Sequence, residues 1–358
     1  MSQDRFAIDG HKLYWHLDRV ADWQKGKLIA PIYVEISPVS FCNNKCIFCG
    51  LDFARDGLML NARLLKSRIE EMGKLGVRSI LFSGEGEPLL HPQIAEIVSH
   101  AKNCGIDVSL ATNGLSGTIQ IWKDILPSLT WIRFSLDAAT PATYARVHGV
   151  TPASFKKTIN SLKEAVRIKK EQNLPVTIGV QFLVIRENLA DIEKALQLFP
   201  EIGVDYLSFK PYSEHPRMLN KSGFTYSPAI IDKVEDSIRR FPGTEKTSII
   251  FRKFATDAYA DGAQRFASCC ATPFWGHISS KGDFYTCGVH LKDARFNVGN
   301  IYSETIEAIL GGDARKKAIA FAEQELKVGR ECRVNCRMAR INEFLDFLRR
   351  EPDHINFI

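Results

Sequence analysis

The sequence predicts an α/β fold: an incomplete barrel of six β–α units, followed by a smaller C-terminal unit. Three observations support this prediction. Runs that are apolar on both faces alternate with segments of helical spacing from about residue 30 to residue 213. This rhythm changes after about residue 213. The chain has 358 residues, 45% of them hydrophobic, which is enough to bury one large core or two modest ones.

The strands of the barrel are predicted from the runs that are apolar on both faces. They are Ile32–Ser40, Ser79–Ser83, Asp107–Ala111, Trp131–Leu136, Val176–Val184 and Tyr206–Lys210. Helical stripes such as the one from Ile94 to Cys104 separate them. Repeated β–α units imply right-handed crossovers and a parallel sheet, here with six units rather than the eight of a complete barrel. Polar motifs after the strand ends should therefore meet at one mouth.

Beyond the barrel, the sequence predicts a connecting helix from a stripe that begins at Ile230, and then a C-terminal unit with a hairpin and a final helix. The hairpin runs from Ile278 to Val289 and turns at Lys281-Gly282-Asp283, and the helix covers about Met338–Arg350. We expect an N-terminal extension over residues 1–30, the barrel over 31–215, a connecting helical segment over 216–254 and the C-terminal domain over 255–358.

Composition narrows the classes of partner. The polar N-terminus lacks a signal region and no apolar run could span a bilayer, so we expect a cytoplasmic protein without membrane contact. The formal net charge of +6 fits an anionic substrate, but the basic residues are scattered, which argues against nucleic acid. Nine cysteines in a reducing compartment should not form structural disulfides, and their clustering indicates metal.

The first cysteine cluster has the spacing Cys42-x3-Cys46-x2-Cys49 and directly follows a predicted strand. Three thiolates from one short loop can bind three irons of a cubane cluster and leave the fourth iron open. Structural zinc normally has four closed ligands, so a zinc knuckle is the weaker alternative.

With the aromatic Phe48 before its last cysteine, this motif resembles the signature of the radical S-adenosylmethionine (radical SAM) superfamily. The resemblance covers about residues 30–213 and implies a partial (β/α)6 TIM-like barrel, a [4Fe–4S] cluster, S-adenosylmethionine and an electron donor such as flavodoxin or ferredoxin. It also implies reductive cleavage of S-adenosylmethionine to a 5′-deoxyadenosyl radical.

Further motifs follow in the order that the resemblance implies. Gly84, Glu85, Gly86 and Glu87 resemble the family's Gly-Gly-Glu-Pro motif, which holds the methionine amino group, although Glu85 stands where a glycine is usual. The remaining candidate cofactor-binding residues are Asn113, Ser135, Asp137, Arg146 and Gln181. Arg146 could pair with the methionine carboxylate, and each residue alone could instead be structural.

A second cluster of cysteines lies in the last third of the chain, with four of them, Cys269, Cys287, Cys332 and Cys336, spaced as a closed metal site. Zinc is an alternative there. The arrangement over about residues 255–340 resembles the twitch (SPASM-like) domain of some radical SAM enzymes, which implies a second [4Fe–4S] cluster.

Cys270 adjoins Cys269, and spacing only weakly favours Cys269 as the ligand. If Cys270 faces the substrate, it could donate a hydrogen atom and give epimerisation. Without such a donor, the auxiliary cluster could accept an electron and give dehydrogenation. A buried, inert thiol is the third reading.

The segment from Lys210 to Arg217 follows the sixth predicted strand and could either grip a substrate or tie the two domains together. We expect a small polar metabolite, such as a carbohydrate, aminocyclitol or nucleotide-linked sugar, because about thirty residues before the first strand are too few for a peptide-recognition domain. The alternatives are a peptide-modifying radical SAM maturase and, more distantly, a non-catalytic zinc-stabilised binding protein.

Overall fold

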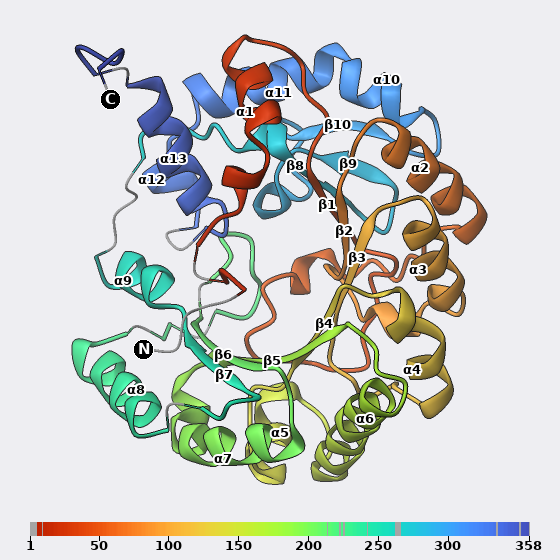
Figure 1. Cartoon of the computed structure of the whole chain (residues 1–358), viewed down its shortest axis with the longest axis vertical. Coiled ribbons are helices and arrows are strands. Elements are labelled where there is room, and N and C mark those ends of the chain that lie inside the picture. Colours follow the sequence, from red (N-terminus) through yellow and green to blue (C-terminus); the bar gives the residue numbers. More distant parts are fainter. Residues whose placement is uncertain are drawn as a thin grey trace.

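The fold is built on one ten-stranded sheet, seen in a computed structural model (Figure 1). The structure describes residues 6–8, 10–212, 214–221, 223–224, 226–241, 243–261, 266–333, 336–350 and 352–357. Its strand order is β10-β9-β8-β1-β2-β3-β4-β5-β6-β7. The strands are β1 Tyr33–Ile36, β2 Ser79–Phe82, β3 Asp107–Thr112, β4 Trp131–Ser135, β5 Thr177–Val184, β6 Tyr206–Pro211, β7 Ser248–Phe251, β8 Trp275–Ile278, β9 Asp283–Tyr285 and β10 Asn297–Asn300.

Strands β1 to β7 are parallel and neighbouring in chain order, as repeated β–α crossovers require. This confirms the predicted partial barrel. The C-terminal unit does not form a separate sheet, because β8 pairs in parallel with β1 and extends the barrel sheet. Strands β9 and β10 then continue it in antiparallel order.

Most helices lie outside the curved sheet (Figure 1). They are α1 Leu17–Gln24, α2 Ala62–Lys74, α3 Ile94–Asn103, α4 Ile119–Ile125, α5 Pro141–His148, α6 Pro152–Glu171, α7 Ile192–Ile202, α8 Pro228–Arg240, α9 Lys253–Asp261, α10 Ile306–Gly311, α11 Asp313–Gln324, α12 Val328–Glu331 and α13 Ala339–Arg349. No helix in the described part of the chain is long and apolar enough to cross a membrane.

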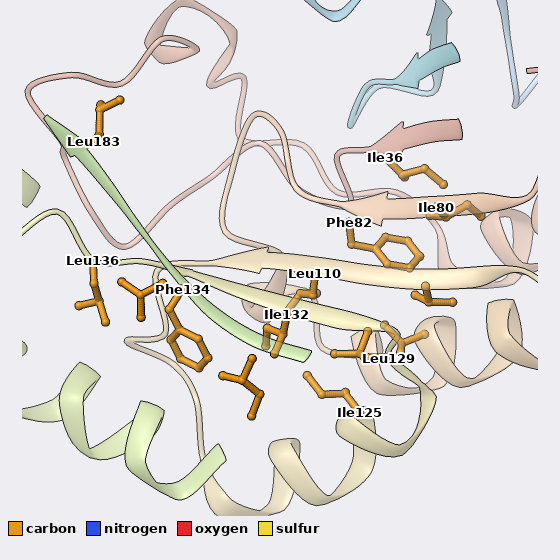
Figure 2. Close-up of a cluster of buried hydrophobic side chains, with 14 of the residues drawn as sticks. Ile36, Ile80, Phe82, Leu110, Ile125, Leu129, Ile132, Phe134, Leu136 and Leu183 are labelled. Atoms are coloured by element: carbon orange, nitrogen blue, oxygen red, sulfur yellow. The ribbon is translucent and has the colours of Figure 1, made fainter. Parts of the chain in front are cut away.

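The core lies between the sheet and its outer helices. Ile80, Phe82, Leu110, Ile132 and Phe134 are fully buried there (Figure 2). Burying each such side chain stabilises the fold by about 1.5–3 kcal/mol. Because successive strand residues face opposite ways, the residues between these apolar positions point into the barrel.

Two predictions at the C-terminal side of the barrel were incomplete. The prediction missed β7, a four-residue run that extends the parallel sheet beyond β6. The hairpin begins three residues earlier than predicted, but it turns where expected: Gly282 has φ +90°, which favours glycine. The final helix was predicted within one residue at each end.

Candidate active site

A cavity of about 850 Å³ opens inside the barrel. It is lined by alternate strand residues, for example Arg133 and Ser135 of β4 and Ser208 and Lys210 of β6. The period of two explains the arrangement, because the intervening residues of these strands face the helices. The cavity has a polar, charged lining inside an apolar shell.

The loop that carries the first three cysteines follows β1 and borders this cavity. The Cys42 Sγ atom accepts a hydrogen bond from the backbone N–H of Asn44 (3.4 Å). The Cys49 Sγ atom accepts one from the Arg55 guanidinium (3.2 Å), and the Cys46 Sγ atom lies 3.2 Å from Nδ1 of His148.

The electrostatics of this loop suit a metal cluster. Burial, with the neighbouring thiols, raises the pKa of Cys46 well above its usual value, and burial raises the pKa of Cys42. Buried thiols of this kind stay neutral unless a positive charge or a metal stabilises the thiolate. Arg55 supplies part of that charge, and iron would supply the rest, so the residues fit a cluster bound through three cysteines.

The turn after β2 packs tightly against the cysteine loop. A Cβ atom at Gly86 would lie 2.3 Å from the carbonyl oxygen of Phe41, and one at Gly84 would lie 1.9 Å from the Ser37 hydroxyl. Gly84 also has φ +97°. Glycine is therefore required at Gly86 by the close approach of the Phe41 backbone, and at Gly84 by the left-handed φ together with the Ser37 side chain.

Glu87 is buried and organises the neighbouring turn after β3. Its carboxylate accepts hydrogen bonds from the hydroxyl of Thr112 (2.6 Å) and the backbone N–H groups of Asn113 (2.7 Å) and Leu89 (3.1 Å). Burial outweighs these bonds and raises the pKa of Glu87. Glu87 lines the cavity, as the resemblance implies for a ligand of an ammonium group.

Glu85, the residue that departs from the family motif, has a partner in the C-terminal unit. Its carboxylate accepts a hydrogen bond from the backbone N–H of Ser280 (2.9 Å), in the turn between β8 and β9. Burial raises its pKa. This carboxylate therefore joins the barrel to the auxiliary hairpin, while also bordering the cavity.

The other candidate cofactor-binding residues divide into two groups. Phe48, Asn113, Ser135, Asp137 and Gln181 all line the cavity. Asp137 accepts a hydrogen bond from the backbone N–H of Leu183 (2.5 Å), and burial raises its pKa to about 7.

Arg146 is not brought to the cavity. It lies on the exposed side of α5, where its guanidinium donates to the carbonyl oxygen of Glu187 (2.6 Å). The residues of α5 that face inward are its neighbours Tyr144, Val147 and His148, so helical spacing turns Arg146 outward.

The auxiliary cysteines are partly buried and pack against two clusters of buried side chains. Cys269 and Cys287 contact both clusters, Cys332 contacts one, and Cys336 contacts the other. The pKa of Cys287 is raised well above its usual value by burial and by the other three thiols. The thiols raise one another's pKa because thiolates repel, and a bound metal cluster removes this repulsion by neutralising their charge. Among the described residues, no group of three or more His, Cys, Asp or Glu side chains is arranged to hold a single metal ion.

Cys270 does not face the cavity, which contradicts its predicted role as a hydrogen-atom donor. Its side chain is fully buried in an apolar cluster with Val20 and Trp23 of α1, Leu345 of α13, and Phe274, which directly precedes β8. Adjacent residues point in opposite directions here, so Cys269 joins the other thiols while Cys270 packs under the terminal helices. Of the three readings weighed for Cys270, the buried structural thiol is the one the structure shows.

Several charged residues of the cavity were missed by sequence reasoning. Glu35 of β1 pairs with Arg337 (2.5 Å). Burial opposes ionisation of Glu35, but Arg337 and His277 outweigh it and lower its pKa to about 2. Arg133 could have been found, because it lies two residues before Ser135 on the same face of a predicted strand. Arg337 could not, because its approach to β1 depends on a contact across 302 positions.

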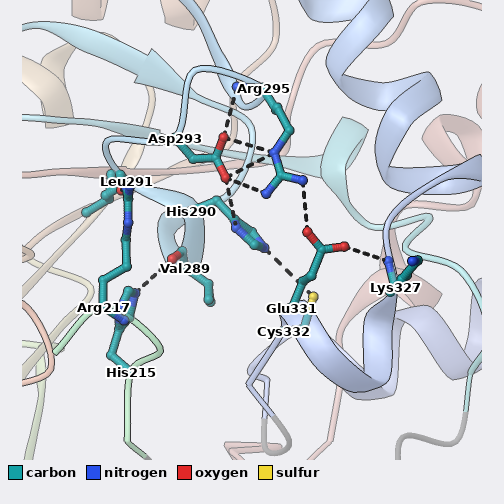
Figure 3. A network of polar contacts seen from close by, with 10 residues as sticks. All are labelled: His215, Arg217, Val289, His290, Leu291, Asp293, Arg295, Lys327, Glu331 and Cys332. Atoms are coloured by element: carbon teal, nitrogen blue, oxygen red, sulfur yellow. Dashed lines mark hydrogen bonds and ion pairs between the residues drawn. The ribbon is translucent and has the colours of Figure 1, made fainter.

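The segment after β6 ties the two units together and also reaches the cavity. His215 lies 2.8 Å from the carbonyl oxygen of Val289, and Arg217 donates to the carbonyl oxygen of Leu291 (2.7 Å), as Figure 3 shows. Lys210 and His215 line the cavity. The predicted link between the two units is therefore present, and contact of this segment with the substrate stays a prediction; Ser213 lies outside the described residues.

Sequence comparison identifies two domains in the chain. The profile of the Radical SAM superfamily matches residues 36–199, and that of the SPASM iron–sulfur cluster-binding domain matches residues 269–337. Probable GTP 3′,8-cyclases are among the similar curated proteins. One, from Saccharolobus islandicus strain M.14.25, is 25% identical over 330 residues, covering 82% of this chain and 96% of its own.

Solved structures share the fold. Streptococcus suis SuiB bound to S-adenosylmethionine is 18% identical, with a TM-score of 0.62 over 89% of this chain and 72% of that chain. AnSMEcpe with bound AdoMet is also 18% identical, with a TM-score of 0.60 over 87% of this chain and 88% of that chain. The two domains imply S-adenosylmethionine and two iron–sulfur clusters as cofactors. The chain is therefore a radical SAM enzyme with a C-terminal SPASM-type iron–sulfur domain.

Proposed function

We propose that this enzyme removes a hydrogen atom from a small polar metabolite, such as a carbohydrate, aminocyclitol or nucleotide-linked sugar, and dehydrogenates it. The observation that supports this proposal best is the cavity of about 850 Å³, whose lining combines both cysteine regions with hydroxyl, amide and cationic side chains. Such a lining suits a compact polar molecule.

The residues have separate tasks in this proposal. Cys42, Cys46 and Cys49 hold the radical SAM cluster, and Cys269, Cys287, Cys332 and Cys336 hold the auxiliary cluster. When bound, these clusters and S-adenosylmethionine supply a 5′-deoxyadenosyl radical and a site for a further electron. The polar groups Glu87, Asn113, Ser135, Asp137 and Gln181 orient S-adenosylmethionine from the strand ends.

Dehydrogenation is preferred to epimerisation because of the thiols. The cysteines among the described cavity-lining residues are Cys42, Cys46, Cys49 and Cys336, and each is assigned to a cluster. Cys270, which could have quenched a substrate radical, is buried elsewhere.

Two observations support a small substrate, and a third supports the proposed domain boundaries. The segment 6–12 contributes six described residues to the cavity wall, which narrows the space for a peptide. The similar cyclases are named for GTP, a nucleotide. The profile matches at 36–199 and 269–337 fall within the proposed domains 31–215 and 255–358, which flank a connecting segment over 216–254.

A flavodoxin or ferredoxin is the proposed electron donor, and the cytoplasm the proposed compartment, where the nine free cysteines would stay reduced.

A peptide-modifying maturase is the second candidate. The observation that favours it is the shared fold with Streptococcus suis SuiB, which has been solved bound to its precursor peptide SuiA. At 18% identity this likeness concerns the fold alone.

The test is anaerobic reconstitution with iron and sulfide, followed by dithionite, S-adenosylmethionine and a panel of nucleotide sugars and aminocyclitols. We expect about eight irons per chain, 5′-deoxyadenosine, and a product two mass units lighter than its substrate. Turnover of a peptide but of none of the metabolites would contradict the proposal.

A further inference from the structure

The cavity contains more cationic groups than the single carboxylate of S-adenosylmethionine would need. Arg133, Lys210, Arg252, Arg333 and Arg337 all line it. They come from β4, β6, the end of β7 and the segment around the last cysteine, so the fold brings them together from distant parts of the sequence.

Two of these cations form no direct ion pair in the described part of the chain, although Asp137 lies near enough for its carboxylate to interact with the charges of both. Arg133 and Lys210 form no ion pair or side-chain hydrogen bond there, and the Nε atom of Arg133 is buried without a partner. Arg337, by contrast, is matched by Glu35. The other acids of the cavity, Glu85, Glu87 and Asp137, each accept backbone N–H groups.

The cations are also close enough to oppose one another. Burial and then the guanidinium groups of Arg252, Arg133, Arg337 and Arg333 lower the pKa of Lys210 well below its usual value. Like charges gathered in a partly desolvated cavity destabilise one another unless an anion joins them. Aromatic rings hold two of the guanidinium groups: Arg133 lies 5.5 Å from the ring of Trp131, and Arg337 5.7 Å from that of Trp275.

We propose that this group of cations, with Lys210 and Arg133 at its centre, binds a phosphate or diphosphate group of the substrate. The inference rests on the proposed function and narrows the substrate to phosphorylated or nucleotide-linked small molecules. Guanidinium groups bind phosphate oxygens in pairs, and a lysine adds a point charge. A single carboxylate would neutralise one charge, whereas a diphosphate matches several, so the surplus favours phosphoryl groups.

The test is calorimetric titration of the anaerobically reconstituted full chain with pyrophosphate. We expect binding to weaken by roughly 10- to 100-fold in Lys210→Met and Arg133→Met, the loss typical of one charge-assisted hydrogen bond. Lys210→Arg keeps the charge and should retain most of the affinity. Lys316→Met removes an exposed lysine paired with Asp313, so it should bind like the unaltered enzyme.

Three results would overturn the inference. These are equal pyrophosphate affinity in Lys210→Met and Lys316→Met, tighter binding of acetate than of pyrophosphate, or tighter binding of a polyglutamate peptide. Circular dichroism establishes that each titrated variant is folded. The titration needs no turnover, so pyrophosphate binding without 5′-deoxyadenosine formation would contradict the proposed function alone. The reverse result would contradict the inference alone.

Discussion

Arg315 allows a quantitative test of how the two units are joined. The side chain is 1% exposed and lies in α11. Its guanidinium donates to three carbonyl oxygens: Leu310 at 3.1 Å, Ile29 at 2.8 Å and Pro273 at 3.1 Å. Ile29 precedes β1 and Pro273 precedes β8, so one side chain bridges the first strand of the barrel and the first strand of the auxiliary hairpin.

The substitution Arg315→Met fills much of the same volume but leaves these three carbonyl oxygens without a donor. Hydrogen bonds to charged groups contribute about 1.5–3 kcal/mol each. Removing the buried charge offsets part of their loss, because its desolvation cost disappears. Burial already lowers the pKa of Arg315 to about 10, which reflects the cost of keeping the charge there. We therefore expect a net loss of about 3–5 kcal/mol in the free energy of unfolding.

Anaerobic urea unfolding of the reconstituted enzyme measures this loss, and hydrogen exchange locates it. Exchange should accelerate in β1 and β8 together. The control is Arg239→Met, an exposed arginine paired with Asp236 on the surface of α8, for which we expect less than about 0.5 kcal/mol. Equal destabilisation by the two substitutions, or faster exchange in β8 alone, would refute the idea that Arg315 joins the two units.

Three further predictions concern single side chains. Cys270→Ala should keep about eight irons per chain, and its product formed in deuterated solvent should contain the same amount of deuterium as that of the unaltered enzyme. Cys269→Ala should fall to about four irons per chain. The opposite iron contents would reverse the assignment. Glu85→Ala removes the acceptor of the Ser280 N–H, so exchange of that amide should accelerate by roughly 10- to 100-fold, and unchanged protection would argue against the link. Burial lowers the pKa of His277 to about 4, below the unfolded value of 6.5, so its stabilisation is present above pH 6.5 and is lost as the pH falls towards 4. Between these limits the free energy of unfolding of the unaltered protein, measured in urea, should fall by on the order of 3 kcal/mol more than that of His277→Gln. Parallel pH profiles of the two proteins would contradict this.

The fold and the cysteine regions were predictable because their signals are local. Apolar runs and helical stripes placed the six barrel strands, and the spacing of Cys42, Cys46 and Cys49 indicated the cluster loop. Period-two alternation also placed Ser135 and Asp137 on one face, and both line the cavity.

The remaining features depend on tertiary contacts. Arg146 was misplaced because its rotation about α5, rather than its position after β4, decides what it faces. Cys269 and Cys270 point in opposite directions because Cys270 packs under α1 and α13. The local sequence around the two cysteines does not reveal this packing. The pairing of β8 with β1 likewise joins residues about 240 positions apart.

The most direct test of the account is electron paramagnetic resonance of the dithionite-reduced cluster before and after addition of S-adenosylmethionine. We predict that the signal shifts in the unaltered enzyme and in the variant in which Cys269, Cys287, Cys332 and Cys336 are all alanine. In the Cys42→Ala/Cys46→Ala/Cys49→Ala variant the shift should be absent. A shift that persists in this triple variant, or none in the unaltered enzyme, would contradict the assignment of the three-cysteine loop as the site that presents an open iron to S-adenosylmethionine.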